Sequence, residues 1–434
     1  MKSVQIGILG FGTVGSGVVK LIQENGSLLE QRLGGQVVIR RIADTDIRRR
    51  RNVDVDPTIL TTDAMAVLED PEIDIIVELI GGYDVALRLC REALNRNKHL
   101  VTANKALLAV HGRELYRTAA ARRVSIGFEA SVGGGIPLIR AMKEGLVADR
   151  VRSIVGIVNG TCNYILTTMT DSRRPFAEVL AEAQAHGYAE ADPSLDVDGI
   201  DSAHKLQILA TLAFGAYVPF DRIHVEGIRR IEASDIEYAC ELGYRIKLLA
   251  IAKQLNGELE ARVHPALIPE DDLLASVSGV HNAVYMVGDA VGSLMFYGRG
   301  AGQMPTASAV VSDIAEIARD LLHDPGARGV SPPQISEAEA DVKEMTAVRS
   351  CYYLRIMTID KPGVLSRVTG ILGNNNISIV SVIQKGRHEQ SAVPIVMLTH
   401  EAVEGDMQRS LRAIDQLDVV SDKTVCLRVE GVTD

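Results

Sequence analysis

The sequence predicts an α/β protein that begins with a doubly wound parallel sheet, continues into an α+β region and ends in a ferredoxin-like βαββαβ module. Three observations support this fold class. Strand-like apolar runs alternate with helical runs as far as the glycine cluster at residues 133–135, the alternation then stops, and residues 323–350 are rich in Pro, Gly, Ser and charge. A chain of 434 residues is also too long for one ordinary hydrophobic core, so we expect several domains.

Residues 1–135 alternate most regularly, and we expect them to form the first domain. Residues 73–79 are almost wholly apolar, as in a central parallel strand that is buried on both faces, and Gly81 and Gly82 end it. The predicted helices cover residues 14–22, residues 85–94 and a segment before the last strand. The predicted strands cover residues 4–9, 37–43, 73–79, 99–102 and 124–130.

A second domain, which binds substrate, is expected over residues 136–304, where long helical patterns such as residues 202–214 mix with shorter strands. Pro305 then occupies a favoured first-turn position for an amphipathic helix over residues 305–322. Its apolar residues recur at helical spacing, so we expect this helix to pack back on the first domain.

We interpret residues 323–350 as a linker and residues 351–432 as a third domain. The predicted strands of this domain cover residues 352–359, 377–384, 392–400 and 424–429, and its helices cover residues 363–372 and 403–417. Their order is the βαββαβ order of a ferredoxin-like domain.

Composition and charge disfavour several classes of function. The formal net charge of −10 makes nucleic acid and anionic membranes poor general partners. The chain has no apolar run near the roughly 20 residues that span a bilayer and starts with a strand-like segment, so we expect a cytoplasmic protein. The five cysteines include no C-x-x-C pair, which indicates reduced thiols rather than disulfides or a thiolate metal site.

A glycine-rich turn follows the first predicted strand, with the sequence Gly10-Phe11-Gly12-Thr13-Val14-Gly15. In the spacing G-x-G-x-x-G, the first glycine permits a tight turn, the second lets a pyrophosphate approach the backbone and the third allows close helix packing. The following helix adds unpaired N–H groups at its N-terminus. A plain glycine turn is the alternative, but the strand and helix around the motif predict a Rossmann domain that binds NAD or NADP.

The choice between the two cofactors depends on the end of the second predicted strand. Asp44 is suited to accept hydrogen bonds from a ribose diol, whereas the arginines at residues 48–51 are suited to neutralise a 2′-phosphate. A solvated face or a helix start also explains the arginine run. We therefore write the cofactor as NAD(P).

Residues 183–205 concentrate charge, with five carboxylates ahead of one lysine. The carboxylates belong to Glu190, Asp192, Asp196, Asp198 and Asp201, and the lysine is Lys205. One interpretation is a solvated acidic loop in which Asp201 caps the next helix. In the other, Asp201 and Lys205 lie four residues apart on one helical face and point together into a cleft, where the lysine acts as an acid or base or holds a charged substrate.

The same segment resembles the signature of the homoserine dehydrogenase family, in the pattern A-x-x-x-G-Y-A-E-x-D-P-x-x-D-V-x-G-x-D-x-x-x-K. Further segments over roughly residues 1–330 are similar to that family in order and spacing. They are Thr102-Ala103-Asn104-Lys105, the run from Glu129 to Pro137, the run from Asn159 to Tyr164 and the run from Gly300 to Ser308.

The resemblance implies the reversible reduction of L-aspartate 4-semialdehyde to L-homoserine, a step towards threonine, methionine and isoleucine. It implies that Lys205 is the proton donor to the aldehyde oxygen and that Lys105 is the second lysine of the cleft. Glu190, Asp196 and Asp201 would hold the amino-acid end of the substrate, whose ammonium group suits their charge. The implied cofactor-binding residues are Gly10, Phe11, Gly12, Thr13, Val14, Gly15, Asp44, Lys105, Gly187, Glu190 and Gly302.

A monovalent-cation site, commonly for sodium, is also implied by the resemblance. Its ligands would be Glu129 and the backbone carbonyls of Val132, Gly134 and Ile136, which are hard oxygen donors. The alternative is a glycine-rich hinge in which Glu129 caps a helix.

Cys162 suggests an alternative class of enzyme, a semialdehyde dehydrogenase that forms an acyl phosphate through a cysteine nucleophile. That chemistry needs a thiolate activated by a nearby base, and residues 159–164 show no such feature. The signature that ends at Lys205 also has no role in it.

Residues 352–429 resemble an ACT domain, a small module that senses amino acids. Such domains often bind ligand at positions like the loop of residues 360–365 and the turn of residues 374–377. The resemblance implies feedback inhibition by threonine and a homodimer or homotetramer. Two alternatives are a dimerisation module without a ligand and a non-catalytic amino-acid sensor, and the intact Lys105, Glu190, Asp201 and Lys205 argue against the second.

Overall fold

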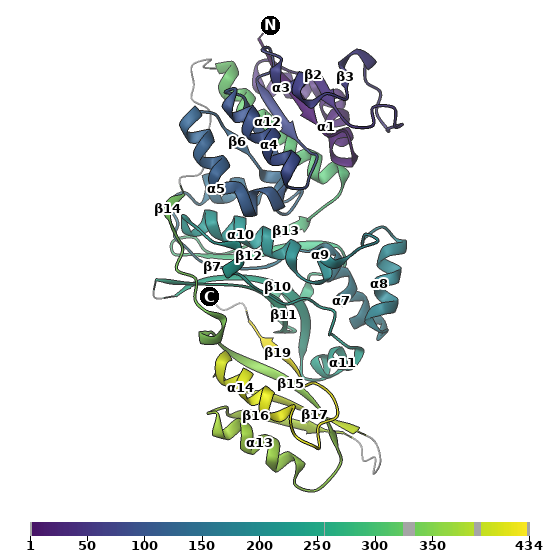
Figure 1. The fold of residues 1–434 in the computed structure, drawn as a ribbon, viewed down its shortest axis with the longest axis vertical. Coiled ribbons are helices and arrows are strands. Elements are labelled where there is room, and N and C mark those ends of the chain that lie inside the picture. The colour runs from purple at the N-terminus through teal and green to yellow at the C-terminus, as the bar shows by residue number, and fades with distance from the viewer. Residues whose placement is uncertain (1, 256, 324–334, 386–391, 432–434) are drawn as a thin grey trace. The chain divides into compact units, whose positions relative to one another are not determined.

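The computed structural model describes residues 2–255, 257–323, 335–385 and 392–431, which form two compact units (Figure 1). The first unit comprises Met1–Arg150, Gln207–Phe220 and Phe296–Glu339. The second comprises Val151–Leu206, Asp221–Met295 and Ala340–Asp434. Segments that are distant in the sequence therefore belong to the same unit.

A six-stranded parallel sheet lies at the centre of the described part of the first unit, in the order β3-β2-β1-β4-β5-β6. The predicted doubly wound sheet is confirmed, because the chain starts at β1 in the middle and winds outwards in both directions. The strands are β1 Ser3–Leu9, β2 Gln36–Ala43, β3 Leu60–Thr61, β4 Ile75–Glu78, β5 His99–Thr102 and β6 Ile126–Gly127.

Strand β6 is shorter than the predicted run of residues 124–130. After Gly127 the Phe128 carbonyl accepts a hydrogen bond from the Ser131 N–H, and the chain turns into the 3₁₀ helix η2, Glu129–Ser131. Hydrophobicity alone does not reveal this change, because the residues that follow the strand stay buried.

Helices of the first unit include α12, Gln303–His323, which packs against α1, Thr13–Glu24. Val18 and Ile22 of α1 share a hydrophobic cluster with Val310 and Ile314 of α12. The other helical elements before residue 150 are α2 Gly26–Leu33, η1 Pro57–Ile59, α3 Ala64–Glu69, α4 Asp84–Asn95, α5 Lys105–Arg122, α6 Leu138–Arg140 and the short π-helix η3 Ala141–Gly145.

Eleven strands form one sheet in the described part of the second unit. Its main order is β13-β12-β7-β10-β11-β19-β15-β17-β16, and the short strands β9 and β18 pair with β11 and β15. The strands are β7 Val151–Ile157, β9 His224–Val225, β10 Tyr244–Leu255, β11 Glu258–Pro269, β12 His281–Gly288, β13 Gly292–Arg299, β15 Arg349–Ile359, β16 Ile379–Gln384, β17 Ala392–Thr399, β18 Ala402–Val403 and β19 Val425–Val429.

The C-terminal part of this sheet has the predicted βαββαβ order, with α13, Val364–Asn374, and α14, Glu404–Ile414, between its strands. Strand β19 also pairs in parallel with β11, where Ala266 faces Arg428 and Leu267 faces Val429. The sheet of the ferredoxin-like module therefore continues into the central sheet, which the sequence does not indicate. The remaining helical elements are α7 Gly160–Ser172, α8 Phe176–Ala185, α9 Ser194–Val197, α10 Ile200–Phe214, η4 Phe220–Arg222, α11 Ala233–Glu241, η5 Leu273–Ser276 and η6 Met345–Ala347.

The segment interpreted as a linker is more regular than its composition predicts. Residues 324–334 lie outside the described residues, but Ser336–Glu339 forms β14, which pairs in parallel with β8, Ala216–Tyr217. The Leu259 N–H then donates to the Asp341 carbonyl at 2.8 Å. Backbone hydrogen bonds therefore hold parts of the segment between residues 335 and 350. No helix in the described ranges is long and apolar enough to cross a membrane.

Candidate active site

The glycine turn between β1 and α1 has the geometry that a dinucleotide pyrophosphate requires. Gly10 has φ +100°, and a Cβ on it would lie 2.7 Å from the Leu79 carbonyl carbon. A Cβ on Gly15 would lie 2.2 Å from the Gly10 carbonyl oxygen, whereas a Cβ on Gly12 would meet no atom within 4 Å. Gly10 and Gly15 therefore allow close packing, and Gly12 keeps the backbone open to a ligand. The turn thus fits the pyrophosphate of NAD(P).

The end of β2 joins this turn through Asp44 and Arg51. The Asp44 carboxylate accepts hydrogen bonds from the Phe11 N–H at 2.6 Å and the Asp46 N–H at 2.8 Å. The Arg51 side chain is 7% exposed, lies 3.3 Å from the Asp44 carboxylate and stacks 4.4 Å above the Phe11 ring. Its Nε also donates to the Phe11 carbonyl at 2.6 Å, so Arg51 holds the turn in place.

The other three arginines of the run differ from Arg51, because Arg48, Arg49 and Arg50 are exposed. In the sequence these four arginines form one uninterrupted basic run. In the structure the Arg51 side chain is buried and contacts the turn, whereas the other three side chains are accessible to solvent or to a ligand.

Lys205 and Asp201 lie one turn apart on α10 in the second unit, and both are buried. The Lys205 ammonium donates to Asp201 Oδ2 at 2.7 Å and to the Val158 carbonyl at 2.6 Å. Asp201 lies inside the helix rather than at its N-cap, and its carboxylate contacts Lys205, so it does not act as the helix cap of the first interpretation. Residue 158 directly follows β7, so the sheet fixes the position of the lysine.

Asn159 joins the acidic residues of this cluster, although it is not among the predicted site residues. Its Nδ2 donates to Asp196 Oδ1 at 2.7 Å and to Asp201 Oδ2 at 2.9 Å. Its Oδ1 accepts from the Cys162 N–H at 2.8 Å and caps α7. The sequence signal that could have marked it is the run from Asn159 to Tyr164, which resembles the homoserine dehydrogenase family.

The remaining candidate residues are distributed between the units. Gly187, with φ +73°, follows the end of α8, and Glu190 lies exposed three residues later. Asp198 instead forms an ion pair with Arg229. Lys105, the first residue of α5, and Gly302, with φ +127°, belong to the first unit.

Glu129 is buried in the first unit, as part of η2. Its Oε1 accepts from the Ile139 N–H at 2.9 Å and its Oε2 accepts from the Arg140 N–H at 2.8 Å. Burial raises the pKa of Glu129, although these two hydrogen bonds oppose the shift. The carboxylate therefore caps α6 as the alternative interpretation expects, while each oxygen keeps a lone pair for a further partner.

Cys162 lacks the properties of a nucleophile. Its side chain is fully buried in α7, and its Sγ donates to the Asp196 carbonyl at 3.2 Å. Burial, together with the negative charges of Asp196 and Asp201, raises the pKa of this thiol well above its ordinary value. A thiolate is thus disfavoured, and the alternative of an acyl-phosphate-forming enzyme is not supported.

A nucleotide turn on a doubly wound sheet, combined with a buried lysine and carboxylates in a separate α+β unit, defines an oxidoreductase that uses a nicotinamide cofactor. Comparison with known families agrees with this class. The family "Homoserine dehydrogenase, NAD binding domain" matches residues 10–129, "Homoserine dehydrogenase" matches residues 137–315, and "ACT domain" matches residues 352–419. The chain belongs to the homoserine dehydrogenase family and is an enzyme of that type.

Individual relatives are similar over nearly the whole chain. Homoserine dehydrogenase from Pseudomonas aeruginosa is 46% identical over 99% of both chains, and that from Bacillus subtilis is 41% identical over 99% of both. The crystal structure of a homoserine dehydrogenase from Thiobacillus denitrificans matches with a TM-score of 0.92 and 43% identity over 99% of both chains. A hyperthermophilic archaeal homoserine dehydrogenase in complex with NADPH matches with a TM-score of 0.61 and 26% identity, over 73% of this chain and 97% of that one.

Proposed function

We propose that Lys205 donates a proton to the aldehyde oxygen when L-aspartate 4-semialdehyde is reduced to L-homoserine, and accepts it in the reverse reaction. The main support for this role is that two hydrogen bonds fix the position of the Lys205 ammonium. Their acceptors are Asp201 Oδ2 at 2.7 Å and the Val158 carbonyl at 2.6 Å. An ammonium group has three N–H donors, so one is left for a substrate oxygen. The bound cofactor would supply the hydride chemistry, as NAD(P)H in the reduction and as NAD(P)⁺ in the reverse oxidation.

Asp201 and Asp196 have separate parts in this proposal. Asp201 orients Lys205 and balances its charge, while Asp196 and the exposed Glu190 attract the substrate ammonium. Asn159 keeps the two aspartates at a fixed separation by donating to both. Lys105, at the start of α5, serves as the second lysine for the substrate.

NADP is the preferred cofactor in this proposal. Arg51 lies 3.3 Å from the Asp44 carboxylate and offsets its charge, and the exposed Arg48, Arg49 and Arg50 come directly before Arg51 in the chain. Clustered guanidinium groups suit a 2′-phosphate. The archaeal relative in complex with NADPH is consistent with this choice.

An Arg49→Gln, Arg50→Gln double variant tests the preference for NADP. It should raise KM for NADP and leave KM for NAD unchanged. An equal effect on both would contradict the assignment.

Steady-state oxidation of L-homoserine with NAD and with NADP in parallel tests the proposed reaction directly. We expect turnover with both and a lower KM for NADP. Absence of nicotinamide reduction by homoserine at millimolar concentrations would contradict the assignment and would favour an amino-acid sensor.

Threonine is proposed as a feedback inhibitor that binds the C-terminal ACT domain, with the enzyme acting in threonine, methionine and isoleucine synthesis as a homodimer or homotetramer. The loop of residues 360–365 supports this: Gly363 has φ +92° and precedes α13, which leaves N–H groups open at the helix start. Calorimetry with L-threonine, alongside rates with and without it, tests the proposal. An unchanged rate together with no heat of binding would make the module structural.

A monovalent cation, in particular Na⁺, is proposed to bind Glu129 and the carbonyls of Val132, Gly134 and Ile136. The open lone pairs of the Glu129 carboxylate and the positive φ of Gly133 and Gly134 support an oxygen-lined turn. Thermal unfolding in NaCl and in choline chloride at equal ionic strength tests this. Equal midpoints would leave Glu129 with its capping role alone.

A further inference from the structure

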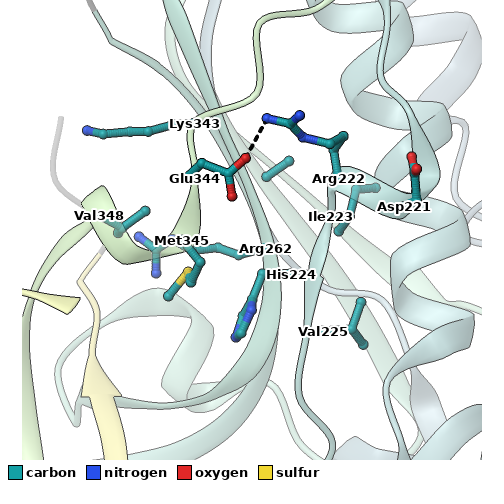
Figure 2. A pocket seen from close by; sticks show the side chains of 11 residues that line it. Asp221, Arg222, Ile223, His224, Val225, Arg262, Lys343, Glu344, Met345 and Val348 are labelled. Carbon is teal, nitrogen blue, oxygen red and sulfur yellow. Dashed lines mark ion pairs between the residues drawn. The ribbon is translucent and has the colours of Figure 1, made fainter. Parts of the chain in front are cut away.

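A pocket of about 330 Å³ lies in the second unit, between β9 with η4 on one side and the segment that leads into β15 on the other (Figure 2). It belongs to neither the glycine turn nor the Lys205 cluster. Its charged and titratable lining residues are Asp221, Arg222, His224, Arg262, Lys343 and Glu344.

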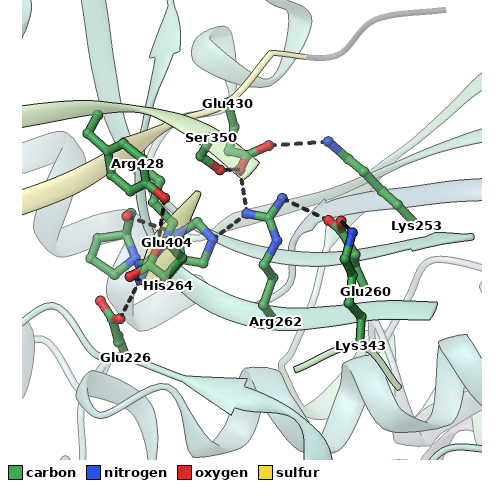
Figure 3. A network of polar contacts seen from close by, with 12 residues as sticks. Glu226, Lys253, Glu260, Arg262, His264, Lys343, Ser350, Glu404, Arg428 and Glu430 are labelled. Atoms are coloured by element: carbon green, nitrogen blue, oxygen red, sulfur yellow. Dashed lines mark hydrogen bonds and ion pairs between the residues drawn. The ribbon is translucent and has the colours of Figure 1, made fainter. Parts of the chain in front are cut away.

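Arg262 lines this pocket and has one buried N–H donor without an acceptor. Its side chain is 3% exposed, and its Nη groups contact Glu430, His264 and Glu260 in a buried network (Figure 3). Its Nε has no hydrogen-bond partner among the described residues. A buried N–H left unpaired costs roughly 1–3 kcal/mol, so an acceptor that reaches Arg262 Nε would stabilise the protein.

Two further cations line the pocket and keep unused donors. Arg222 uses one of its terminal nitrogens for the Val342 carbonyl at 3.0 Å and for Glu344 at 2.8 Å. Lys343 lies 3.4 Å from Glu260. The pairing of Arg222 with Glu344 is exposed, with 47% and 71% of the two side chains accessible, so it is a weak competitor for a bound anion.

We infer that this pocket binds a small anion that presents carboxylate or phosphate oxygens, with one oxygen accepting from Arg262 Nε and the others facing Arg222 and Lys343. The anion would displace Glu344 from Arg222. The volume suits a metabolite of a few carbon atoms rather than a nucleotide. Because β9 and residues 343–348 line it together, such a ligand would contact both the central strands and the segment that leads into the ACT domain.

Isothermal titration calorimetry of the full chain tests this inference. Succinate represents a carboxylate source, inorganic phosphate represents a phosphate source, and neutral 1,4-butanediol is the uncharged control, all at constant ionic strength. We expect saturable binding of at least one anion and none of the diol. The anion that binds more tightly shows whether the natural ligand presents carboxylate or phosphate oxygens.

Three variants locate the binding site. Arg222→Gln should weaken binding by roughly ten- to hundredfold, which corresponds to the loss of one charged hydrogen bond. Glu344→Gln removes the competing carboxylate and should tighten binding. Arg367→Gln is the matched control, because the Arg367–Asp418 ion pair at 2.7 Å has similar exposures of 46% and 79% but lies outside the pocket.

Two outcomes would overturn the inference. One is no binding of either anion at millimolar concentration, in which case a water molecule satisfies Arg262. The other is binding that Arg222→Gln and Arg367→Gln affect equally. All three substitutions lie on exposed ion pairs, so loss of folding does not confuse the result.

Discussion

The Lys205 ammonium donates to the Asp201 carboxylate at 2.7 Å, from a position one turn later on the same buried helix. An ion pair of this spacing on a helix surface is common and weak. This one is 10% and 9% exposed, and Lys205 also donates to a strand-end carbonyl, so its direction is fixed. A fixed, buried ammonium is suited to proton transfer at one defined atom.

Substitution of Lys205 by alanine should therefore abolish most turnover. We expect kcat for homoserine oxidation to fall by roughly 10²–10⁴-fold, while NADPH binding, measured by the fluorescence of the reduced nicotinamide, is retained. Lys20→Ala is the matched control, because Lys20 also pairs four residues along its helix, with Glu24, but is 43% exposed. Near-normal turnover of Lys205→Ala would remove the proposed role.

Asn159→Asp should separate the bridging role of this residue from its capping role. The new carboxylate keeps an oxygen for the Cys162 N–H but loses the Nδ2 donor to Asp196 and Asp201. Three close carboxylates repel one another, so we expect kcat at neutral pH to fall roughly ten- to hundredfold. Activity should recover as the pH falls, because a proton taken up by the cluster restores a donor.

The control for this variant is Asn159→Ser, which keeps a capping oxygen and adds no charge. Its rate should fall without a new dependence on pH. If the pH–rate profiles of Asn159→Asp and the unsubstituted enzyme have the same shape, the amide does not act as a bridge between the two carboxylates.

Cys162→Ser should leave the reaction almost unchanged. The thiol is fully buried with a raised pKa, and a serine hydroxyl retains a donor for the Asp196 carbonyl. We expect homoserine oxidation within about twofold of the unsubstituted rate and a stability loss of at most roughly 1–3 kcal/mol. A loss of activity by orders of magnitude in a folded Cys162→Ser variant would revive nucleophilic catalysis.

The local sequence pattern is sufficient to predict much of the fold and part of the candidate site. The glycine spacing and the strand before it predict the turn because each glycine has its own steric reason, as the contacts of Gly10 and Gly15 show. The four-residue spacing of Asp201 and Lys205 predicts their contact because helical geometry alone brings them together.

Tertiary relationships could not be predicted in this way. The pairing of β11 with β19 joins residues 266 and 428, and alternation within a strand does not specify which strand its edge will meet. Asn159 has the sequence context of any helix cap, and only the folded chain brings two aspartates to its amide. Likewise, nothing in a run of four arginines distinguishes Arg51 from its neighbours.

Acid should destabilise the second unit through Glu430. Burial opposes ionisation of this carboxyl, but the positive charges of Arg262 and Lys253 lower its pKa to about 2 (Figure 3). Because the pKa in the folded state is below the unfolded value of 4.5, the stabilisation is fully present above pH 4.5. It is lost as the pH falls from 4.5 through about 2, by about 3 kcal/mol.

Chemical denaturation at a series of pH values, with Glu430→Gln as the test variant, measures this effect. At pH 7 the variant should lose on the order of 3–5 kcal/mol, because the buried Arg262 keeps its charge without this partner. Below pH 4.5 its stability should change less steeply than that of the unsubstituted protein. Glu401→Gln is the control, since Glu401 pairs with Arg349 but is 57% exposed, and it should lose less than about 1 kcal/mol. Parallel stability curves for Glu430→Gln and the unsubstituted protein between pH 4.5 and 2 would show that Glu430 is not the group that responds to acid.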